Sequence, residues 1–406
     1  MRNSSERILT SHAGSLPRPD DLIELNRARL AGEHDENAFQ TRLRGAVVDL
    51  VQHQADTGID VPNDGEFGHE MGDRVDYGAW WGYVFERLGG LKLEDATSLF
   101  EMPPNRSSPG NVQLTSFTDR RDWVAFGDAY GDPESGISVG GASRQYPSAQ
   151  GPITYVGHDA VARDIANAKA AFAAAGVEEG FLNSVAPASA ARVANDYYAT
   201  EEEFIWACAD ALREEYKAIV DSGLILQLDD PAIAENWDQI NPQPSVEDYQ
   251  RFTMTRVEAL NHAIRDLPAD RIRFHLCWGS WHGPHTTDIP MRDIVDVILA
   301  INAGGYSFEA GNVRHEHEWK VWQDVTLPEG KVILPGVVSH ATNVVEHPEV
   351  VADRIVRYAE AVGRENVIAS SDCGLGGRVH SQIAWAKLDS LAKGAELATS
   401  RLWRSG

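Results

Sequence analysis

The stretch RIRFHLCW, residues 271–278, decides how this chain is interpreted. We predict that it forms a buried β-strand. Alternate residues of a strand point to the same face, so the imidazole of His275 and the thiol of Cys277 would project together. Taken alone, a histidine and a cysteine two residues apart on a buried strand are more often packed core side chains than ligands. The rest of the chain decides between these interpretations.

Seven other segments have the character of strands, near residues 8, 59, 181, 224, 305, 331 and 367. Most are apolar runs without polar alternation, which is typical of parallel strands covered on both faces. Helical patterns separate them, including residues 37–57, which end at Gly58. Strands that alternate with helices imply right-handed βαβ units. We therefore predict an α/β fold, a (β/α)8 TIM barrel. An open doubly wound sheet is the alternative, weakened because no G-x-G-x-x-G follows the first strand.

Residues 67–150 interrupt this alternation after the second strand. They are rich in Gly, Pro, Ser, Asp and aromatic residues, and a structureless loop of that length would be unusual. We predict an insertion with its own short strands that folds over one end of a single domain, residues 1–406. Its aromatic residues either shape a substrate pocket or form the core of the insertion; they include Trp80, Trp81 and Trp123.

The chain carries 61 acidic against 36 basic residues, a formal net charge of −25. Such a charge repels nucleic acid and anionic membrane surfaces, so we expect neither as a partner and favour a small-molecule substrate. The N-terminus lacks an apolar signal segment, and no apolar run has the length of a membrane span. Three cysteines argue against a disulfide framework and for a reducing, cytoplasmic setting. The sequence leaves open whether the chain forms a homo-oligomer.

Polar and ionisable side chains gather at the expected C-terminal ends of the strands, where TIM barrels carry their chemistry. Asp229 and Asp230 precede Pro231, so a capping role is their alternative interpretation. Further histidines lie in loops and are rival ligands, namely His282, His285, His315 and His317. The strand-end residues are Ser15, Glu66, Asp229, Asp230, His275, Cys277, Glu309, His340 and Cys373.

Four of these side chains predict a tetrahedral zinc site, because zinc prefers histidine, thiolate and carboxylate ligands. They are His275, Cys277, Glu309 and Cys373. Glu309 could instead orient another ligand and leave its place to water or substrate. A zinc ion with two thiolates is a poor activator of water, but a thiol bound to it stays nucleophilic. We therefore predict alkyl transfer to a zinc-bound thiolate. A zinc-water hydrolase or lyase with His340 or Glu66 as base is the alternative, and a non-catalytic zinc protein is the third.

These motifs resemble the C-terminal barrel of cobalamin-independent methionine synthase, over nearly the whole chain from His12. The resemblance implies a (β/α)8 barrel in methionine biosynthesis, with Zn²⁺ held by the four residues above. It implies that Ser15, Glu66 and Asp229 bind the amino-acid substrate, homocysteine, and that Glu66 and Asp229 act with His340 in catalysis. His340 corresponds to a histidine proposed to assist proton transfer.

Two departures bear on the alkyl donor. The full-length synthase has a second, N-terminal barrel that helps hold polyglutamyl folate, for which this chain leaves no room. A tryptophan that stacks on the pterin follows the family's Gly-Pro-Val-Thr segment, whereas here residues 151–154 run on to Tyr155. Single-barrel relatives take methyl groups from a corrinoid or, as epoxyalkane:coenzyme M transferases, alkylate another thiol. Because two carboxylates would repel a sulfonate, Glu66 and Asp229 favour an aminothiol.

Overall fold

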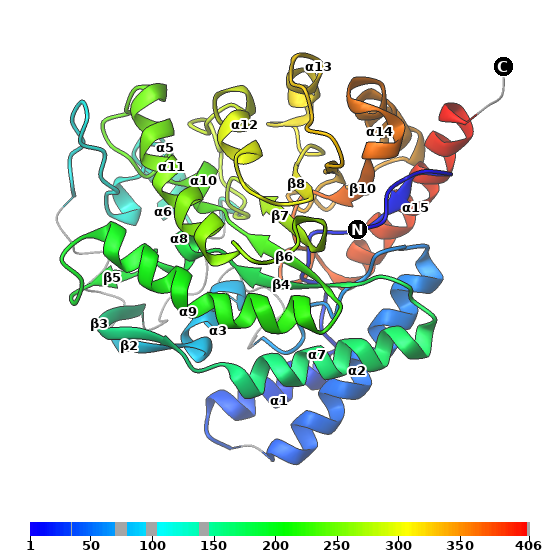
Figure 1. The fold of residues 1–406 in the computed structure, drawn as a ribbon, viewed down its shortest axis with the longest axis horizontal. Coiled ribbons are helices and arrows are strands. Elements are labelled where there is room, and N and C mark those ends of the chain that lie inside the picture. The colour runs from blue at the N-terminus through cyan, green and yellow to red at the C-terminus, as the bar shows by residue number, and fades with distance from the viewer. Residues whose placement is uncertain (34, 70–78, 95–103, 138–145, 404–406) are drawn as a thin grey trace.

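The computed structural model describes residues 1–33, 35–69, 79–94, 104–137 and 146–403. Within them, seven parallel strands form one curved sheet in the order β1-β10-β9-β8-β7-β6-β4 (Figure 1). Almost every residue of these strands is buried, as the apolar runs predict. The strands are β1 Leu9–Thr10, β4 Phe181–Val185, β6 Ile225–Asp229, β7 Ile272–Leu276, β8 Gly305–Glu309, β9 Val332–Val338 and β10 Ile368–Ser371.

The segment expected to form the second strand closes the barrel without being a regular strand. The backbone nitrogen of Val61 donates to the carbonyl of Thr10 at 3.0 Å, and that of Phe181 donates to the carbonyl of Pro62 at 3.1 Å. Asn63 then forms a parallel bridge with Phe181. Pro62 has no N–H to donate, which shortens the ladder. The expectation of eight regular strands was therefore wrong in this detail, while the circuit is that of the predicted (β/α)8 barrel.

Helices surround the strands, with the loops of the carboxyl ends between them (Figure 1). Helix α2 begins after Asp35, whose side chain accepts from two backbone N–H groups, and ends at Gly58 with a φ of 92°. The surrounding helices are α1 Asp20–Leu30, α2 Glu36–Thr57, α7 His158–Ala175, α8 Pro187–Ala190, α9 Glu201–Asp221, α10 Ala232–Glu235, α11 Val246–Ala263, α12 Met291–Leu299, α13 Val321–Asp324, α14 Pro348–Val362 and α15 Ser381–Leu402, with 3-10 turns η2 Ala269–Arg271, η3 Glu316–Lys320 and η4 Arg364–Asn366.

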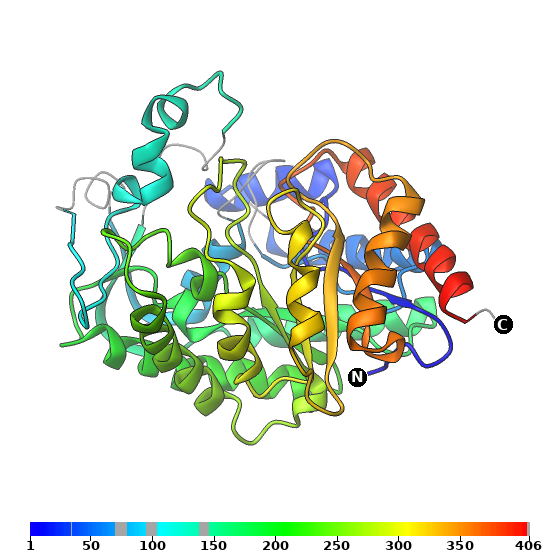
Figure 2. The same cartoon turned by 90° about the horizontal axis from the view of Figure 1, so that it is seen from above.

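The inside of the barrel changes character along the strands. Its amino-terminal end is filled by two small apolar clusters, and Met1 packs against both. The opposite end carries the polar side chains described below. The N-terminal segment lies beside α15 in both views (Figures 1 and 2), and the Ile8 backbone donates to Thr399. None of the helices in the described ranges combines the length and apolar character needed to cross a membrane.

The insertion has its own secondary structure, as predicted. Strands β2 Leu88–Glu94 and β3 Tyr146–Tyr155 pair antiparallel, and β5 Ala194–Asn195 adds to β3. Because β3 runs to Tyr155, residues 151–155 continue the insertion ladder instead of returning to the barrel. The insertion lies to one side of the barrel, with its short helices at upper left in Figure 2. Its helices are α3 Ala79–Arg87, η1 Phe117–Asp119, α5 Arg121–Ala125 and α6 Gly127–Gly131.

Candidate active site

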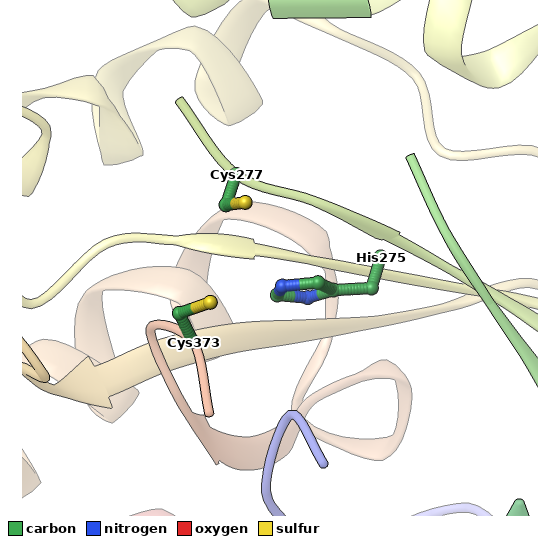
Figure 3. Close-up of side chains that lie close together, drawn as sticks. All are labelled: His275, Cys277 and Cys373. Atoms are coloured by element: carbon green, nitrogen blue, oxygen red, sulfur yellow. The ribbon is translucent and has the colours of Figure 1, made fainter. Parts of the chain in front are cut away.

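Three of the four predicted zinc ligands converge at the carboxyl end of the barrel. A ligand atom of His275, of Cys277 and of Cys373 all lie within 4.8 Å of one another. Figure 3 shows the imidazole reaching from β7 towards the two sulfur atoms, one from the end of β7 and the other from the loop after β10. The two-residue spacing on β7 and the position of Cys373 after the last strand bring this group together.

The donor atoms of this group fit a metal ion. His275 Nδ1 lies 2.9 Å from Ser307 Oγ, so its ring orientation is fixed from behind. Its other nitrogen, Nε2, is buried and has no hydrogen-bond partner among the described residues. When Nδ1–H donates to Ser307, Nε2 offers a lone pair beside two sulfur atoms. A hydrogen bond between the thiols lowers the pKa of Cys373 well below its usual range and raises that of Cys277. One nitrogen and two sulfurs form a donor set that suits zinc.

Glu309, the fourth predicted ligand, lies beside this group but is not one of the three. Its carboxylate accepts from the Trp278 backbone at 2.8 Å and from Asn312 Nδ2 at 2.5 Å. Glu309, His340 and Asp372 form a second buried group whose ligand atoms lie within 4.8 Å of one another. Burial raises the pKa of Glu309 well above its usual range. The carboxylate is therefore next to the metal-binding group while tied to the backbone after β7.

His340 borders both groups and has an open ring nitrogen. The side chain is buried, and Nδ1 has no hydrogen-bond partner among the described residues. Burial lowers the pKa of His340 to about 4, although the neighbouring Cys373 opposes this shift. His340 is therefore neutral near pH 7 in the metal-free protein.

Glu66 and Asp229 form a pair of buried carboxylates on the same side of the site. Burial, followed by the charge of Asp229, raises the pKa of Glu66 well above its usual range. Burial also raises the pKa of Asp229 to about 6. Two carboxylates that repel each other in a buried site are stabilised by a shared cation. Glu66 moreover has a φ of 60°, a left-handed conformation that is unusual for a residue other than glycine.

Ser15 lies on the other side of the same mouth, against the loop that carries Cys373. Its carbonyl accepts hydrogen bonds from the backbones of Leu375 and Gly376, at 2.9 Å each. Gly374 allows this approach, because a Cβ there would lie 2.9 Å from the Cβ of Ser15. All of the predicted substrate-binding residues thus border the metal-binding group.

Replacement of Gly14 by alanine should disrupt the carboxylate side of the site. Gly14 has a φ of 138°, and a Cβ at this position would overlap both Glu66 Oε1 and Asn183 Nδ2. We expect a loss of acceptor binding of about tenfold or more, the scale of one displaced hydrogen bond to a charged group. Calorimetric titration with homocysteine measures it. The matched control is Gly110→Ala, a positive-φ glycine with open space around it, and equal binding losses in both variants would contradict the expectation.

Sequence reasoning missed the polar residues that hold the predicted ones in place. Gln227 and Asn183 donate to the two oxygens of Asp229, at 2.7 Å and 2.9 Å. Ser307 orients His275. A signal for two of these was present: Gln227 and Ser307 precede Asp229 and Glu309 by two residues, so each shares the inward face of its strand.

The rival histidines have other partners. His315 is buried, stacks on Trp278 with ring centroids 3.9 Å apart, and contacts Glu318 at 2.9 Å and Asp288 at 3.2 Å. Burial opposes its charge, but these two hydrogen bonds raise the pKa of His315 to about 10. His285 contacts Asp288 from the other side at 3.2 Å. Neither belongs to a three-ligand group among the described residues.

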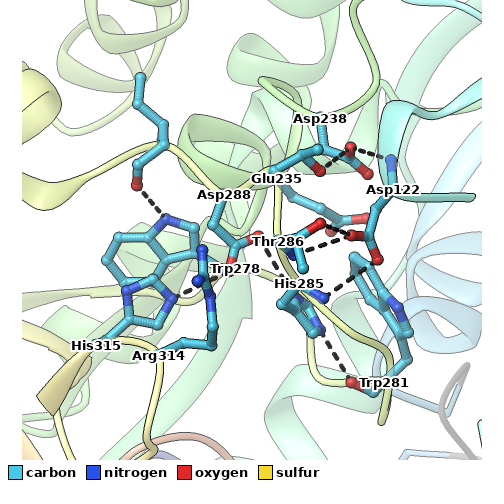
Figure 4. Close-up of polar contacts among 12 residues, drawn as sticks. Asp122, Glu235, Asp238, Trp278, Trp281, His285, Thr286, Asp288, Arg314 and His315 are labelled. Atoms are coloured by element: carbon cyan, nitrogen blue, oxygen red, sulfur yellow. Dashed lines mark hydrogen bonds and ion pairs between the residues drawn. The ribbon is translucent and has the colours of Figure 1, made fainter. Parts of the chain in front are cut away.

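The insertion is fastened to the loop that follows β7 (Figure 4). The Asp122 carboxylate accepts from the backbones of His285 and Thr286, at 3.2 Å and 2.9 Å. Arg120 is buried between Glu235 and Asp238, 2.9 Å and 2.8 Å away, with its guanidinium 4.2 Å from the Trp281 ring centroid. The insertion thus covers part of the site end of the barrel, as predicted. Trp123 stacks on Tyr130 within the insertion, whereas the side chains of Trp80 and Trp81 fall outside the described residues.

Comparisons with known proteins agree with this fold. Residues 151–396 match the family described as "Cobalamin-independent synthase, Catalytic domain". The chain is 24% identical over 399 residues to a methionine synthase of Thermococcus kodakarensis, covering 98% of this chain and 95% of that protein. It is 24% identical over 400 residues to one of Saccharolobus solfataricus, covering 98% and 96%. A B12-independent methionine synthase from Shewanella sp. W3-18-1, solved in complex with selenomethionine, superposes with a TM-score of 0.66 at 19% identity, over 98% of this chain and 99% of that one.

Proposed function

This chain belongs to the family of cobalamin-independent synthase catalytic domains, and on that premise we propose that it is a zinc-dependent methyltransferase that methylates the thiol of homocysteine. The observation that carries the proposal is the convergence of His275 Nε2 with the sulfurs of Cys277 and Cys373. A pair of carboxylates suited to an ammonium group lies beside it.

We assign His275, Cys277 and Cys373 to the metal, with Glu309 as the fourth ligand that an incoming thiol displaces. Zinc bound by two thiolates would lower the pKa of that thiol and leave its sulfur nucleophilic. The hydrogen bonds from Trp278 and Asn312 support this role for Glu309, because they give the carboxylate a resting position when it leaves the metal.

The acceptor's ammonium group would lie between Glu66 and Asp229, whose mutual repulsion it relieves. Ser15 would orient the same amino-acid end from the opposite side. We assign proton exchange with the donor's leaving group to His340, because its buried Nδ1 has no partner among the described residues.

For the methyl donor we propose a carrier other than polyglutamyl folate. Tyr155 follows the segment where the family has its pterin-stacking tryptophan. Its hydroxyl donates to Glu215 at 2.5 Å, and the side chain is only 6% exposed. A buried ring held in this way has no open face on which a pterin could stack.

Removal of the metal should abolish methyl transfer to homocysteine, and zinc should restore it. X-ray absorption of the zinc-loaded protein should show a zinc–sulfur shell that gains one sulfur when homocysteine is added. An unchanged shell would favour a zinc-bound water and the hydrolase or lyase alternative. Full activity after complete removal of zinc would overturn the proposal.

A further inference from the structure

A buried cation lies directly beneath the carboxylate pair. Arg273 precedes His275 by two residues on β7, so it shares the inward face of the barrel, and it is 1% exposed. Its guanidinium lies 3.5 Å from the Phe181 ring centroid. Among the described residues, no carboxylate approaches it within the 4.0 Å of an ion pair. An unpaired charge inside a barrel is costly, which points to a role beyond packing.

Arg273 fixes the orientation of a neighbouring amide. Its Nε donates to Gln227 Oε1 at 2.5 Å, so the amide oxygen of Gln227 must face the guanidinium. The Gln227 amino group then faces the other way and donates to Asp229 Oδ1 at 2.7 Å and to the Ala13 carbonyl at 2.6 Å. The reversed amide would place two donors against each other and two acceptors against each other.

The second oxygen of Asp229 is held by the same logic. Asn63 Nδ2 donates to Asn183 Oδ1 at 2.9 Å, which turns the amino group of Asn183 towards Asp229 Oδ2, also at 2.9 Å. Each carboxylate oxygen thus accepts from an amide that a second donor orients from behind. Donors on this side leave the remaining lone pairs of Asp229 directed towards the site.

Arg273 cannot itself meet a substrate. Its other two nitrogens donate to Ser11 Oγ at 2.8 Å and to the His12 carbonyl at 2.5 Å, and it lies one layer below the carboxylates. We propose that Arg273, acting through Gln227, is a positioning residue that aims Asp229 at the ammonium group of an amino-thiol acceptor. The inference rests on the proposed function and adds the residues that make the site selective for this acceptor class.

The test compares two acceptors that differ only in the amino group, homocysteine and 4-mercaptobutyrate. Loss of aim should lower the preference for homocysteine, as the ratio of kcat/KM values, by about 10- to 100-fold in Arg273→Met and Gln227→Met, the range for one hydrogen bond to a charged group. The effect should fall mainly on KM for homocysteine. Crystal structures of the metal-free variants should show the Asp229 carboxylate rotated from its wild-type position.

The control is Arg256→Met, which removes another buried guanidinium, one bonded to Glu201 and the Phe252 carbonyl on the outer helix α11. Its acceptor preference should match the wild type. Equal losses for both acceptors in the Arg273 and Gln227 variants would overturn the inference, since a structural role predicts that result. If the wild type methylates neither thiol, the proposed function fails, and the position of Asp229 in the variant crystals still decides whether Arg273 and Gln227 position it.

Discussion

Replacing Cys373 by serine should remove both bound zinc and methyl transfer. The serine hydroxyl stays protonated where the thiolate is the ligand, so only His275 and Cys277 would remain of the three converging donors. Loss of groups behind a ligand already costs 10- to 100-fold, so we expect more than about 100-fold in metal affinity. Elemental analysis of the purified protein measures the zinc, and methionine formation from homocysteine measures the activity. Cys277→Ser should behave in the same way.

The chain supplies a matched control in its third cysteine. Cys208 is buried on α9 in the apolar core and outside both ligand groups. Cys208→Ala should keep its zinc and its turnover, because only a small apolar contact is lost. A Cys373→Ser protein with wild-type zinc content and activity would contradict the assignment of the metal site. Loss of both in the Cys208 variant would show that the assay reports folding and not ligation.

The ligand group was predictable because strand geometry is simple. Residues two apart on a strand share a face, and parallel strands end at the same side of a barrel, so His275, Cys277 and Cys373 could be brought together from sequence alone. The partners of Glu309 could not. They come from the loops after β7 and β8, whose path depends on packing and not on a repeating pattern.

The errors in the fold have similar physical causes. Pro62 removes a donor, so the second strand became a bridging segment with ladder bonds on both sides. Residues 151–155 were expected in the barrel because they are apolar and extended, which suits the β2–β3 hairpin equally well. Arg273 and Gln227 were overlooked inside apolar runs, although the same two-residue period that identified the ligands marks both as inward-facing.

Replacing Arg87 by methionine should cause the largest loss of stability. Arg87 ends α3 of the insertion and is 3% exposed, with ion pairs to Asp164 on α7 at 2.7 Å and to Glu215 on α9 at 3.0 Å. Burial raises the pKa of Asp164, but Arg163 and Arg87 outweigh it and hold that pKa below its usual range. Removal of one partner of a buried ion pair costs about 3–5 kcal/mol, because a buried charge is left uncompensated. Urea unfolding followed by circular dichroism measures the difference.

Two further variants decide whether charge is the cause. Asp164 keeps Arg163 at 2.8 Å, so Glu215 is the group left without a cation. The double variant Arg87→Met/Glu215→Gln should therefore recover much of the lost stability. Arg401→Met, which removes an exposed guanidinium paired with Asp353 at 2.7 Å, should cost no more than about 1 kcal/mol. If Arg87→Met costs as little as Arg401→Met, the ion pairs do not hold the insertion to α7 and α9. If the double variant is no more stable than Arg87→Met, the loss comes from packing and not from the uncompensated carboxylate.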